Sequence, residues 1–138
     1  MKALPFSPKV LRDAGLGRES KRGGTNDFFR ARVLFPIFDV QGDPIGFGGR
    51  MMPDGRPPKY QNTPETALYR KSKVLYGLNW AKDEAVRENE VIICEGYTDV
   101  IGFAEVGLHR AVATCGTGLT DEHVRTLQRF APDHGSRL

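Results

Sequence analysis

Hydrophobic and polar positions in the second half of the chain predict strands and helices that alternate. Short apolar runs occur at residues 91–94 and 111–114, and each is followed by a segment of helical composition, at residues 98–106 and 121–130. Thr120 is a suitable N-cap for the second of these helices. A strand–helix–strand–helix order predicts an α/β fold in which the two strands are parallel and joined by a right-handed crossover.

The first half has a different pattern. Residues 7–16 predict a short helix, because Ser7 can cap it and Pro8 suits the first helical position. The apolar stretches VLFPIFDV and IGFGGRMM flank the turn residues QGDP, and this predicts a β-hairpin over residues 32–51. Pro36 cannot donate a ladder hydrogen bond, so we expect it at a sheet edge or a bulge.

Polar stretches rich in glycine and proline separate these elements. Residues 21–27 and 53–67 are predicted loops, whereas residues 80–89 have helical composition and would link two lobes. The expected division is an α+β lobe over residues 1–80, a connecting helix over 81–90, a parallel-stranded βαβα lobe over 91–132 and a tail over 133–138.

Composition and length are those of an ordinary globular domain. Of the 138 residues, 39% are hydrophobic and 27% are charged, which suits one compact unit. No apolar run approaches the roughly 20 residues that cross a bilayer, and no signal peptide is recognisable. We therefore expect a cytoplasmic protein with no membrane partner.

The two cysteines do not form a metal-binding motif. Cys94 and Cys115 fall in a predicted strand and at a strand end, without Cys-x-x-Cys spacing or a matching histidine pair. We therefore expect no zinc in this chain. In a reducing compartment two buried thiols are favoured over a disulfide, which stays the alternative.

The charge distribution adds information that the net charge of +3 conceals. Residues 1–80 contain 14 Lys and Arg against 7 Asp and Glu, whereas residues 81–138 contain 6 against 10. A basic half beside an acidic half suits a polyanion-binding surface next to a carboxylate site. The alternative is an ordinary solvated surface, and the charges alone do not distinguish the two.

Two carboxylates follow the first parallel strand. Glu95 comes directly after the strand, Gly96 permits a sharp turn, and Asp99 falls in the first turn of the next helix. Ligands collect beyond the carboxyl ends of such strands, so Glu95 and Asp99 are candidates for holding a divalent cation or for acid–base catalysis. Alternatively, Asp99 only complements the helix N-terminus and Glu95 is a solvated turn residue.

Cationic and aromatic residues are interspersed in the basic half. Such a mixture suits single-stranded nucleic acid or a nucleoside triphosphate, because cations contact phosphates and aromatic rings stack on bases. Any one of these lysines, taken alone, is explained equally well as a surface residue. The set comprises Arg30, Arg32, Arg50, Lys59, Lys71 and Lys73 among Phe28, Phe29, Tyr60, Asn62 and Tyr69.

Four consecutive stretches resemble motifs of the bacterial DnaG-type primase catalytic core. They are RVLFPIFDVQGDPIGFGGR, PPKYQNTPET, LYRKSKVLYGLNWA and EGYTDVI, they occur in the family's order, and the resemblance covers roughly residues 7–131. It implies a basic N-terminal lobe that faces template and nucleotides. It also implies that EGYTDVI opens an acidic Toprim lobe, of which residues 91–132 form a part.

The resemblance also implies roles for particular residues. Glu95 would be the catalytic glutamate, acting as general base or metal ligand, and Asp99 an acidic neighbour at the metal site. Magnesium or manganese is the implied cofactor, and a single-stranded DNA template and ribonucleoside triphosphates are the implied partners. Residues implied to contact template or nucleotide are Arg32, Arg50, Lys59, Tyr60, Asn62 and Lys71.

The resemblance leaves the metal site incomplete. The family draws further aspartates from an Asp-x-Asp strand that is not recognisable here, and Asp133 stands alone in a tail without such a strand. The family's zinc-binding and helicase-binding domains are not recognisable either, so the replicative helicase would be a partner of full-length members only. We therefore expect a fragment of a DNA primase core, related to synthesis of short RNA primers for DNA replication, that is inactive alone.

Two other functions fit parts of the same pattern. A non-catalytic module that binds single-stranded nucleic acid would need the basic lobe and no polymerase site. A Toprim-type nuclease or topoisomerase would share Glu95 and its strand–turn–helix setting, although the upstream motifs argue against it.

Overall fold

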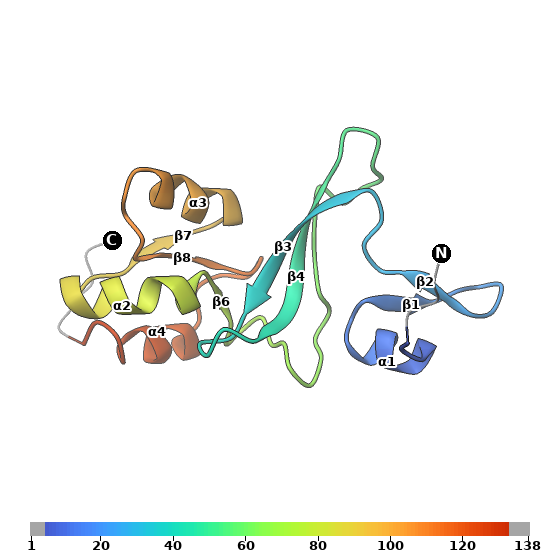
Figure 1. Ribbon diagram of the computed structural model, residues 1–138, viewed down its shortest axis with the longest axis horizontal. Coiled ribbons are helices and arrows are strands. Elements are labelled where there is room, and N and C mark those ends of the chain that lie inside the picture. The colour runs from blue at the N-terminus through green and yellow to red at the C-terminus, as the bar shows by residue number, and fades with distance from the viewer. Residues whose placement is uncertain (1–4, 133–138) are drawn as a thin grey trace.

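The computed structural model describes residues 5–132. Figure 1 shows an elongated molecule, with a helical lobe at one end, a β-sheet in the middle and a small helix-and-hairpin unit at the other end. In chain order the elements are α1 (Pro8–Asp13), β1 (Gly17–Glu19), β2 (Thr25–Asp27), β3 (Arg32–Phe38), β4 (Pro44–Met51), β5 (Tyr60–Asn62), β6 (Leu75–Tyr76), α2 (Leu78–Glu88), β7 (Ile92–Cys94), α3 (Tyr97–Glu105), β8 (Ala111–Thr114) and α4 (Asp121–Leu127).

The N-terminal unit consists of α1 and an antiparallel hairpin. Ser7 caps α1 as predicted, since its hydroxyl oxygen accepts a hydrogen bond from the Val10 N–H at 3.3 Å. The prediction of a plain loop over residues 21–27 is wrong in part, because its last three residues form β2, which pairs with β1. Each strand has only three residues, too few to produce a recognisable alternation.

The middle sheet has the strand order β3-β4-β5, all antiparallel. The predicted hairpin over residues 32–51 is confirmed, and Pro36 lies on β3, whose described ladder partner is β4, at the edge of the sheet. The prediction of a loop over residues 53–67 is wrong in part, because β5 lies inside it. This three-residue strand is defined by its pairing with the glycine-containing strand β4 and not by a pattern of its own.

The sheet of the helical lobe has the order β6-β8-β7. The predicted parallel pair is confirmed, with Ile92 opposite Ala111 and Cys94 opposite Ala113. The βαβα prediction omitted β6, which adds to this sheet in the antiparallel direction. A two-residue strand carries no periodic signal, and only its pairing with β8 identifies it. The predicted boundaries between lobes stay a prediction.

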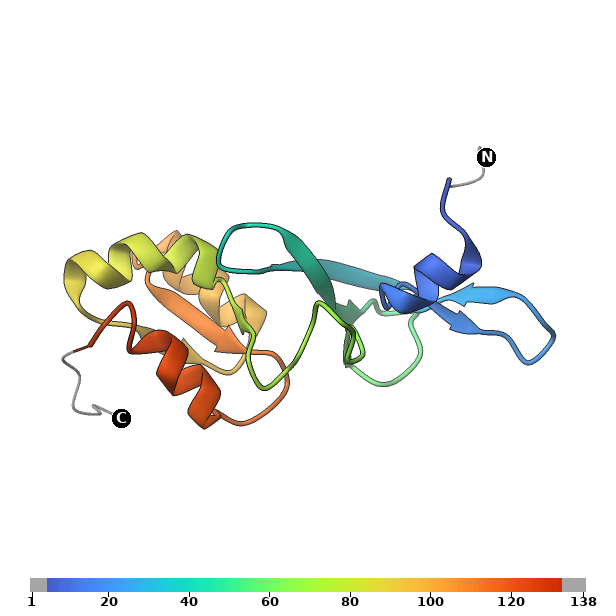
Figure 2. The ribbon, with the colours of Figure 1, turned by 90° about the horizontal axis from the view of Figure 1, so that it is seen from below.

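Helices cover both faces of this sheet. Figures 1 and 2 show α3 on one side and α2 and α4 on the other. Successive side chains of β8 point to opposite faces of the sheet and so contribute to two separate hydrophobic clusters. Ala111 and Ala113 belong to one cluster and Val112 to the other. Within the described residues, no helix is long and apolar enough to cross a membrane.

A buried ion pair joins α2 to the segment before β8. Glu84 is 9% exposed, and its carboxylate accepts hydrogen bonds from Arg110 Nη1 at 2.8 Å and from the His109 N–H at 3.2 Å. The hydrogen bond from Arg110 lowers the pKa of Glu84, and the backbone bond acts in the same direction. The pair therefore favours the ionised carboxylate in the folded state.

This ion pair predicts a pH dependence of stability. A carboxylate with a lowered folded-state pKa stabilises the fold above its ordinary pKa and loses that contribution as the pH falls through the folded-state value. Glu84→Gln should therefore reduce stability near about pH 7 and flatten the decline of stability between about pH 5 and about pH 2. Urea unfolding across this range checks the prediction, and parallel curves for both proteins would contradict it.

Candidate functional site

The carboxyl end of β7 presents the two predicted carboxylates to solvent. Glu95 directly follows the strand and is exposed, and its side chain has no hydrogen-bond or ion-pair partner among residues 5–132. Gly96 is the N-cap of α3, and Asp99 Oδ2 accepts a hydrogen bond from its N–H at 3.0 Å. Asp99 therefore caps the helix, as the alternative interpretation expected, while its side chain stays exposed.

No third possible metal ligand joins the two carboxylates within residues 5–132. Carboxylate oxygens are the ligand type that Mg²⁺ prefers, but the ion takes an octahedral set of six oxygens. No group of three or more His, Cys, Asp or Glu side chains within residues 5–132 could hold a metal. Asp133 lies outside the described residues. Glu95 and Asp99 can therefore supply only a share of a metal site.

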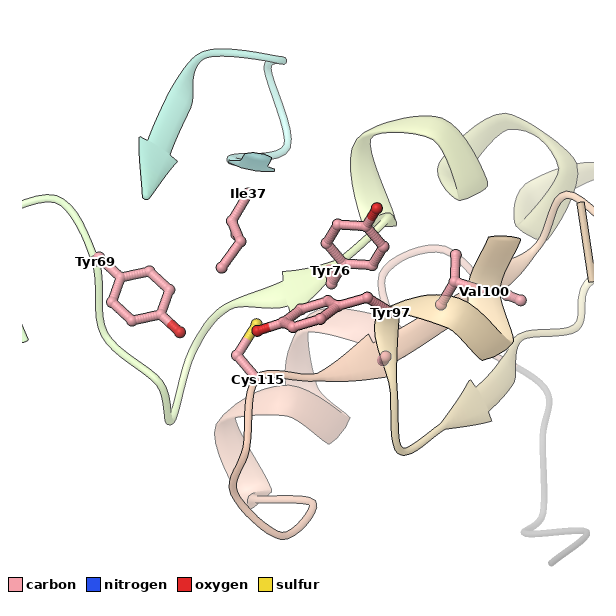
Figure 3. Packing of buried hydrophobic residues seen from close by; sticks show 8 residues of the cluster. Ile37, Tyr69, Tyr76, Tyr97, Val100 and Cys115 are labelled. Atoms are coloured by element: carbon pink, nitrogen blue, oxygen red, sulfur yellow. The ribbon is translucent and has the colours of Figure 1, made fainter. Parts of the chain in front are cut away.

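Tyr97, two residues after Glu95, connects the helical lobe to the middle sheet. It is 5% exposed, and its ring stacks on Phe35 of β3 at a centroid distance of 5.3 Å and meets Tyr76 edge-on at 4.7 Å. Figure 3 shows the side chains of Tyr97 and Tyr69 converging on Cys115. Burial, with Cys115 nearby, raises the pKa of Tyr97, so its hydroxyl remains a proton donor.

The hydroxyl of Tyr97 belongs to a hydrogen-bond chain that crosses between the two sheets. It donates to Asn62 Oδ1 at 2.6 Å, and Asn62 Nδ2 donates to the carbonyl oxygen of Cys115 at 2.8 Å. Asn62 thus links β5 to the start of α3 and to the end of β8. Both the oxygen and the nitrogen of the Asn62 amide are therefore already hydrogen-bonded within the protein.

Gly48 allows this close approach. A Cβ atom on Gly48 would lie 2.6 Å from the hydroxyl oxygen of Tyr97 and nearer still to two of its ring carbons. Such separations are far inside ordinary contact distance. The GFGGR segment therefore needs glycine here so that the tyrosine can pack directly against the β4 backbone.

The register of the middle sheet places several predicted residues on one face. Residues directly opposite in an antiparallel pair share a face, and Phe35 is opposite Gly48, which is opposite Asn62. Two residues farther along, Arg50 is opposite Tyr60, and both are exposed. Arg50 and Tyr60 thus lie about 7 Å along the strands from the contact with Tyr97.

The other predicted binding residues are placed differently. Val33 lies opposite Arg50 and shares its face, so Arg32, the preceding residue of β3, lies on the other face of the sheet. There its guanidinium donates to the carbonyl oxygens of Arg56 at 3.0 Å and Lys59 at 3.4 Å. Lys59 is exposed, with its ammonium 5.9 Å from the centroid of the Tyr60 ring. Arg32 therefore fixes the loop between β4 and β5.

Lys71 lies in the segment that leads into the helical lobe. Its N–H donates to Glu65 at 3.0 Å, and its carbonyl oxygen is 2.9 Å from Nε2 of the buried His123. Burial raises the pKa of the Cys115 thiol, and the positive charge of Lys71 acts in the opposite direction. Lys71 therefore lies on the Cys115 side of the molecule, near the chain of hydrogen bonds through Asn62.

Sequence patterns did not identify Tyr97 or Gly48 as residues of the site. The sequence places Tyr97 only within the EGYTDVI motif, and Gly48 only within the predicted hairpin. The contact between them joins residues 49 positions apart. The one available signal was the density of glycine in a strand, which indicates that something packs closely.

Two family comparisons cover most of the chain. Residues 1–82 match the family described as DNA primase catalytic core, N-terminal domain, and residues 89–136 match the Toprim domain. A DNA primase of Streptomyces coelicolor is 44% identical over 132 residues, which are 95% of this chain and 20% of the relative. A DNA primase of Pseudomonas putida is 47% identical over 125 residues, which are 90% of this chain and 19% of the relative. The chain spans about a fifth of the length of these relatives.

Solved structures show the same arrangement. The RNA polymerase domain of the Mycobacterium tuberculosis primase DnaG has a TM-score of 0.86 and 39% identity, covering 96% of this chain and 43% of that one. A DnaG primase catalytic domain bound to single-stranded DNA has a TM-score of 0.79 and 41% identity, and the match covers 88% of this chain and 38% of that one. The α/β fold expected from the sequence is thereby confirmed.

Proposed function

The chain belongs to the bacterial DnaG-type DNA primase family, and from this premise we propose that it binds a single-stranded template and ribonucleoside triphosphates for primer synthesis. One observation supports this most directly. Strand register puts Arg50 and Tyr60 on the face that contacts Tyr97, two residues from the exposed Glu95. A cation and an aromatic ring on a face that packs against Tyr97, with a carboxylate two residues before this tyrosine, suit a nucleic-acid strand at a phosphoryl-transfer site. We place this function in the cytoplasm.

Glu95 and Asp99 are the proposed contribution to a magnesium or manganese site. The ion would neutralise charge on the nucleotide phosphates when bound. Because residues 5–132 contain no group of three such ligands, we propose that further carboxylates from outside these residues complete the site. We therefore propose that the 138-residue chain by itself binds template without polymerising nucleotides.

The binding part of the proposal is tested with variants of the exposed face. Tyr60→Ala should weaken binding of fluorescein-labelled oligo(dT) at least about fivefold, since stacking contributes about 1–3 kcal/mol per base. Tyr60→Phe, which keeps the ring, should bind like the wild type. Arg50→Gln should weaken binding and reduce its salt dependence, whereas Arg129→Gln on the helical lobe should not. Anisotropy titrations that do not separate Arg50→Gln from Arg129→Gln would reject this face as the template site.

Nucleotide incorporation distinguishes the proposal from a complete polymerase. Labelled ribonucleotides are supplied with single-stranded DNA and magnesium to the wild type and to Glu95→Gln. Neither should incorporate label, and both should bind DNA equally. Incorporation that Glu95→Gln abolishes would show that the described carboxylates suffice.

A second candidate is a non-catalytic module that binds single-stranded nucleic acid. The same incomplete ligand set supports it. The two candidates differ in Glu95, which a purely binding module would not use. Magnesium-dependent strengthening of ribonucleotide binding in the wild type, lost in Glu95→Gln, would favour the primase site.

A further inference from the structure

We propose that His123 is a positioning residue for the nucleotide: together with Glu65 it fixes the main chain at Lys71, so that the Lys71 ammonium can bind the phosphates of a nucleoside triphosphate. The inference rests on the proposed function and deepens it, because it concerns how the nucleotide is held and not the template. His123 lies in α4, and it reaches a segment 52 positions earlier in the chain.

Both ring nitrogens of His123 form hydrogen bonds, and the side chain is fully buried. Nδ1 accepts from the Thr120 N–H at 3.2 Å, so the proton of the neutral ring is on Nε2. Nε2 then donates to the carbonyl oxygen of Lys71 at 2.9 Å. The bond to Thr120 completes the cap of α4, whereas the bond to Lys71 holds a segment outside the helix.

Other side chains hold the same segment. Thr120 Oγ1 donates to the carbonyl oxygen of Ser72 at 2.6 Å, and Ser72 Oγ donates to Glu122 at 3.2 Å. The N–H of Lys71 donates to Glu65 Oε1 at 3.0 Å. The main chain on both sides of the Lys71 side chain is therefore fixed before any ligand arrives, which lowers the entropic cost of a contact made by its ammonium.

The two lysines of this segment differ in their pairing. Lys73 Nζ lies 3.2 Å from Glu122 Oε1, so its charge is already balanced by a carboxylate. The ammonium of Lys71 has no hydrogen-bond or ion-pair partner in the part of the chain that the structure describes. An unpaired ammonium on a fixed main chain is suited to a phosphate, which it binds as a point charge.

Lys71 lies near the edge of the sheet that carries Glu95. Because β7 and β8 are parallel, their carboxyl ends meet at one edge, where Glu95 follows β7 and Cys115 follows β8. Burial raises the pKa of the Cys115 thiol and the charge of Lys71 opposes this rise, so Lys71 is close to the end of β8. The phosphates of a nucleotide bound beside Glu95 would thus have a cation at the neighbouring strand end.

A charge-matched pair of variants tests the phosphate contact. Lys71→Gln and Lys73→Gln each remove one positive charge from the same segment, unpaired in the first case and paired with Glu122 in the second. Binding of ATP that carries a fluorescent group on its ribose is titrated with magnesium at about 0.15 M salt. Lys71→Gln should weaken binding at least about tenfold, as expected for loss of a hydrogen bond between charged groups. Lys73→Gln should weaken it less than about twofold.

Two substitutions of His123 separate its two hydrogen bonds. The shorter side chain of His123→Asn can place an acceptor near the Nδ1 position but does not reach Lys71, whereas His123→Gln can place a donor near the Nε2 position. His123→Asn should weaken ATP binding about threefold to tenfold, because Lys71 must then be ordered on binding. His123→Gln should bind close to the wild type, and His123→Asn should cause no further loss in the Lys71→Gln background. Circular dichroism sets a temperature at which every variant is folded.

A second pair serves if His123→Asn does not fold. Glu65→Ala and Glu65→Gln remove the same negative charge from an exposed position, and only glutamine keeps an acceptor for the Lys71 N–H. Glu65→Ala should therefore bind ATP at least about twofold more weakly than Glu65→Gln. Equal binding by these two variants would overturn the inference.

Three further results would also overturn it. They are equal losses for Lys71→Gln and Lys73→Gln, an equal loss for His123→Asn with and without Lys71, and a loss of oligo(dT) binding by Lys71→Gln with unchanged ATP binding. If Arg50→Gln weakens oligo(dT) binding while Lys71→Gln leaves ATP binding unchanged, the inference fails and the proposed function stands. If the wild type binds neither ATP nor oligo(dT), both fail.

Discussion

Gly48→Ala is expected to lower the free energy of unfolding by about 2–3 kcal/mol, and the melting temperature by about 5–10 °C. The new methyl group would lie 2.6 Å from the hydroxyl oxygen of Tyr97. Tyr97 has little room to retreat, because its ring also packs on Phe35 and Tyr76. The two sheets must therefore separate, or the tyrosine must leave its place. Urea unfolding and thermal denaturation measure the change.

A second glycine provides the control for this substitution. Gly102 lies in α3, and apart from its chain neighbours and the nearby backbone of the helix no atom is within 4 Å of the position of an added Cβ. Gly102→Ala should therefore raise stability by up to about 1 kcal/mol, through helix propensity alone. If both alanine variants have the stability of the wild type, Gly48 and Tyr97 are not in close contact.

Asn62→Ala is expected to lower the free energy of unfolding by about 2–4 kcal/mol. The substitution leaves two partly buried groups unpaired, the hydroxyl of Tyr97 and the carbonyl oxygen of Cys115. Each unsatisfied group costs about 1–3 kcal/mol, and water reaching the gap lowers the total. Denaturant unfolding of the purified variant measures the loss.

A double-mutant cycle with Tyr97→Phe isolates the hydrogen bond between the two side chains. Tyr97→Phe keeps the stacked ring and removes the hydroxyl, so Asn62→Ala should cost less in that background, by about 0.5–1.5 kcal/mol. Strict additivity of the two changes would contradict the bond. Asn62→Ala should also be compared in DNA binding at a temperature where it stays folded. A binding loss without a stability loss would assign Asn62 to template contact alone.

Asn62 has two candidate roles, one in binding and one in holding the fold together. The resemblance implies that Asn62 contacts template or nucleotide, and the structure shows its amide bridging Tyr97 and Cys115. Arg50 and Tyr60 have exposed side chains on the same face and carry no such bridge. Substitutions at these two positions therefore report on binding with less effect on folding.

Elements with a strong local pattern were predictable from the sequence. The hairpin over residues 32–51, the capping of α1 by Ser7 and of α4 by Thr120, and the parallel pairing of β7 and β8 are all present. Each depends on neighbouring residues: turn formers between apolar runs, a hydroxyl before a helix, or alternation of strands with helices. The strands β1, β2, β5 and β6 have two or three residues and were missed.

By itself the sequence determined the family, the order of the main elements and the candidate carboxylates Glu95 and Asp99, because motifs and short-range periodicity are properties of neighbouring residues. Only the tertiary structure decided which of the candidate residues share a face. It brought Arg50, Tyr60 and Asn62 together, turned Arg32 to the other side, and inserted Tyr97 between the two sheets. Strand register and the packing of a ring against a glycine depend on residues far apart in the chain, and no local pattern specifies them.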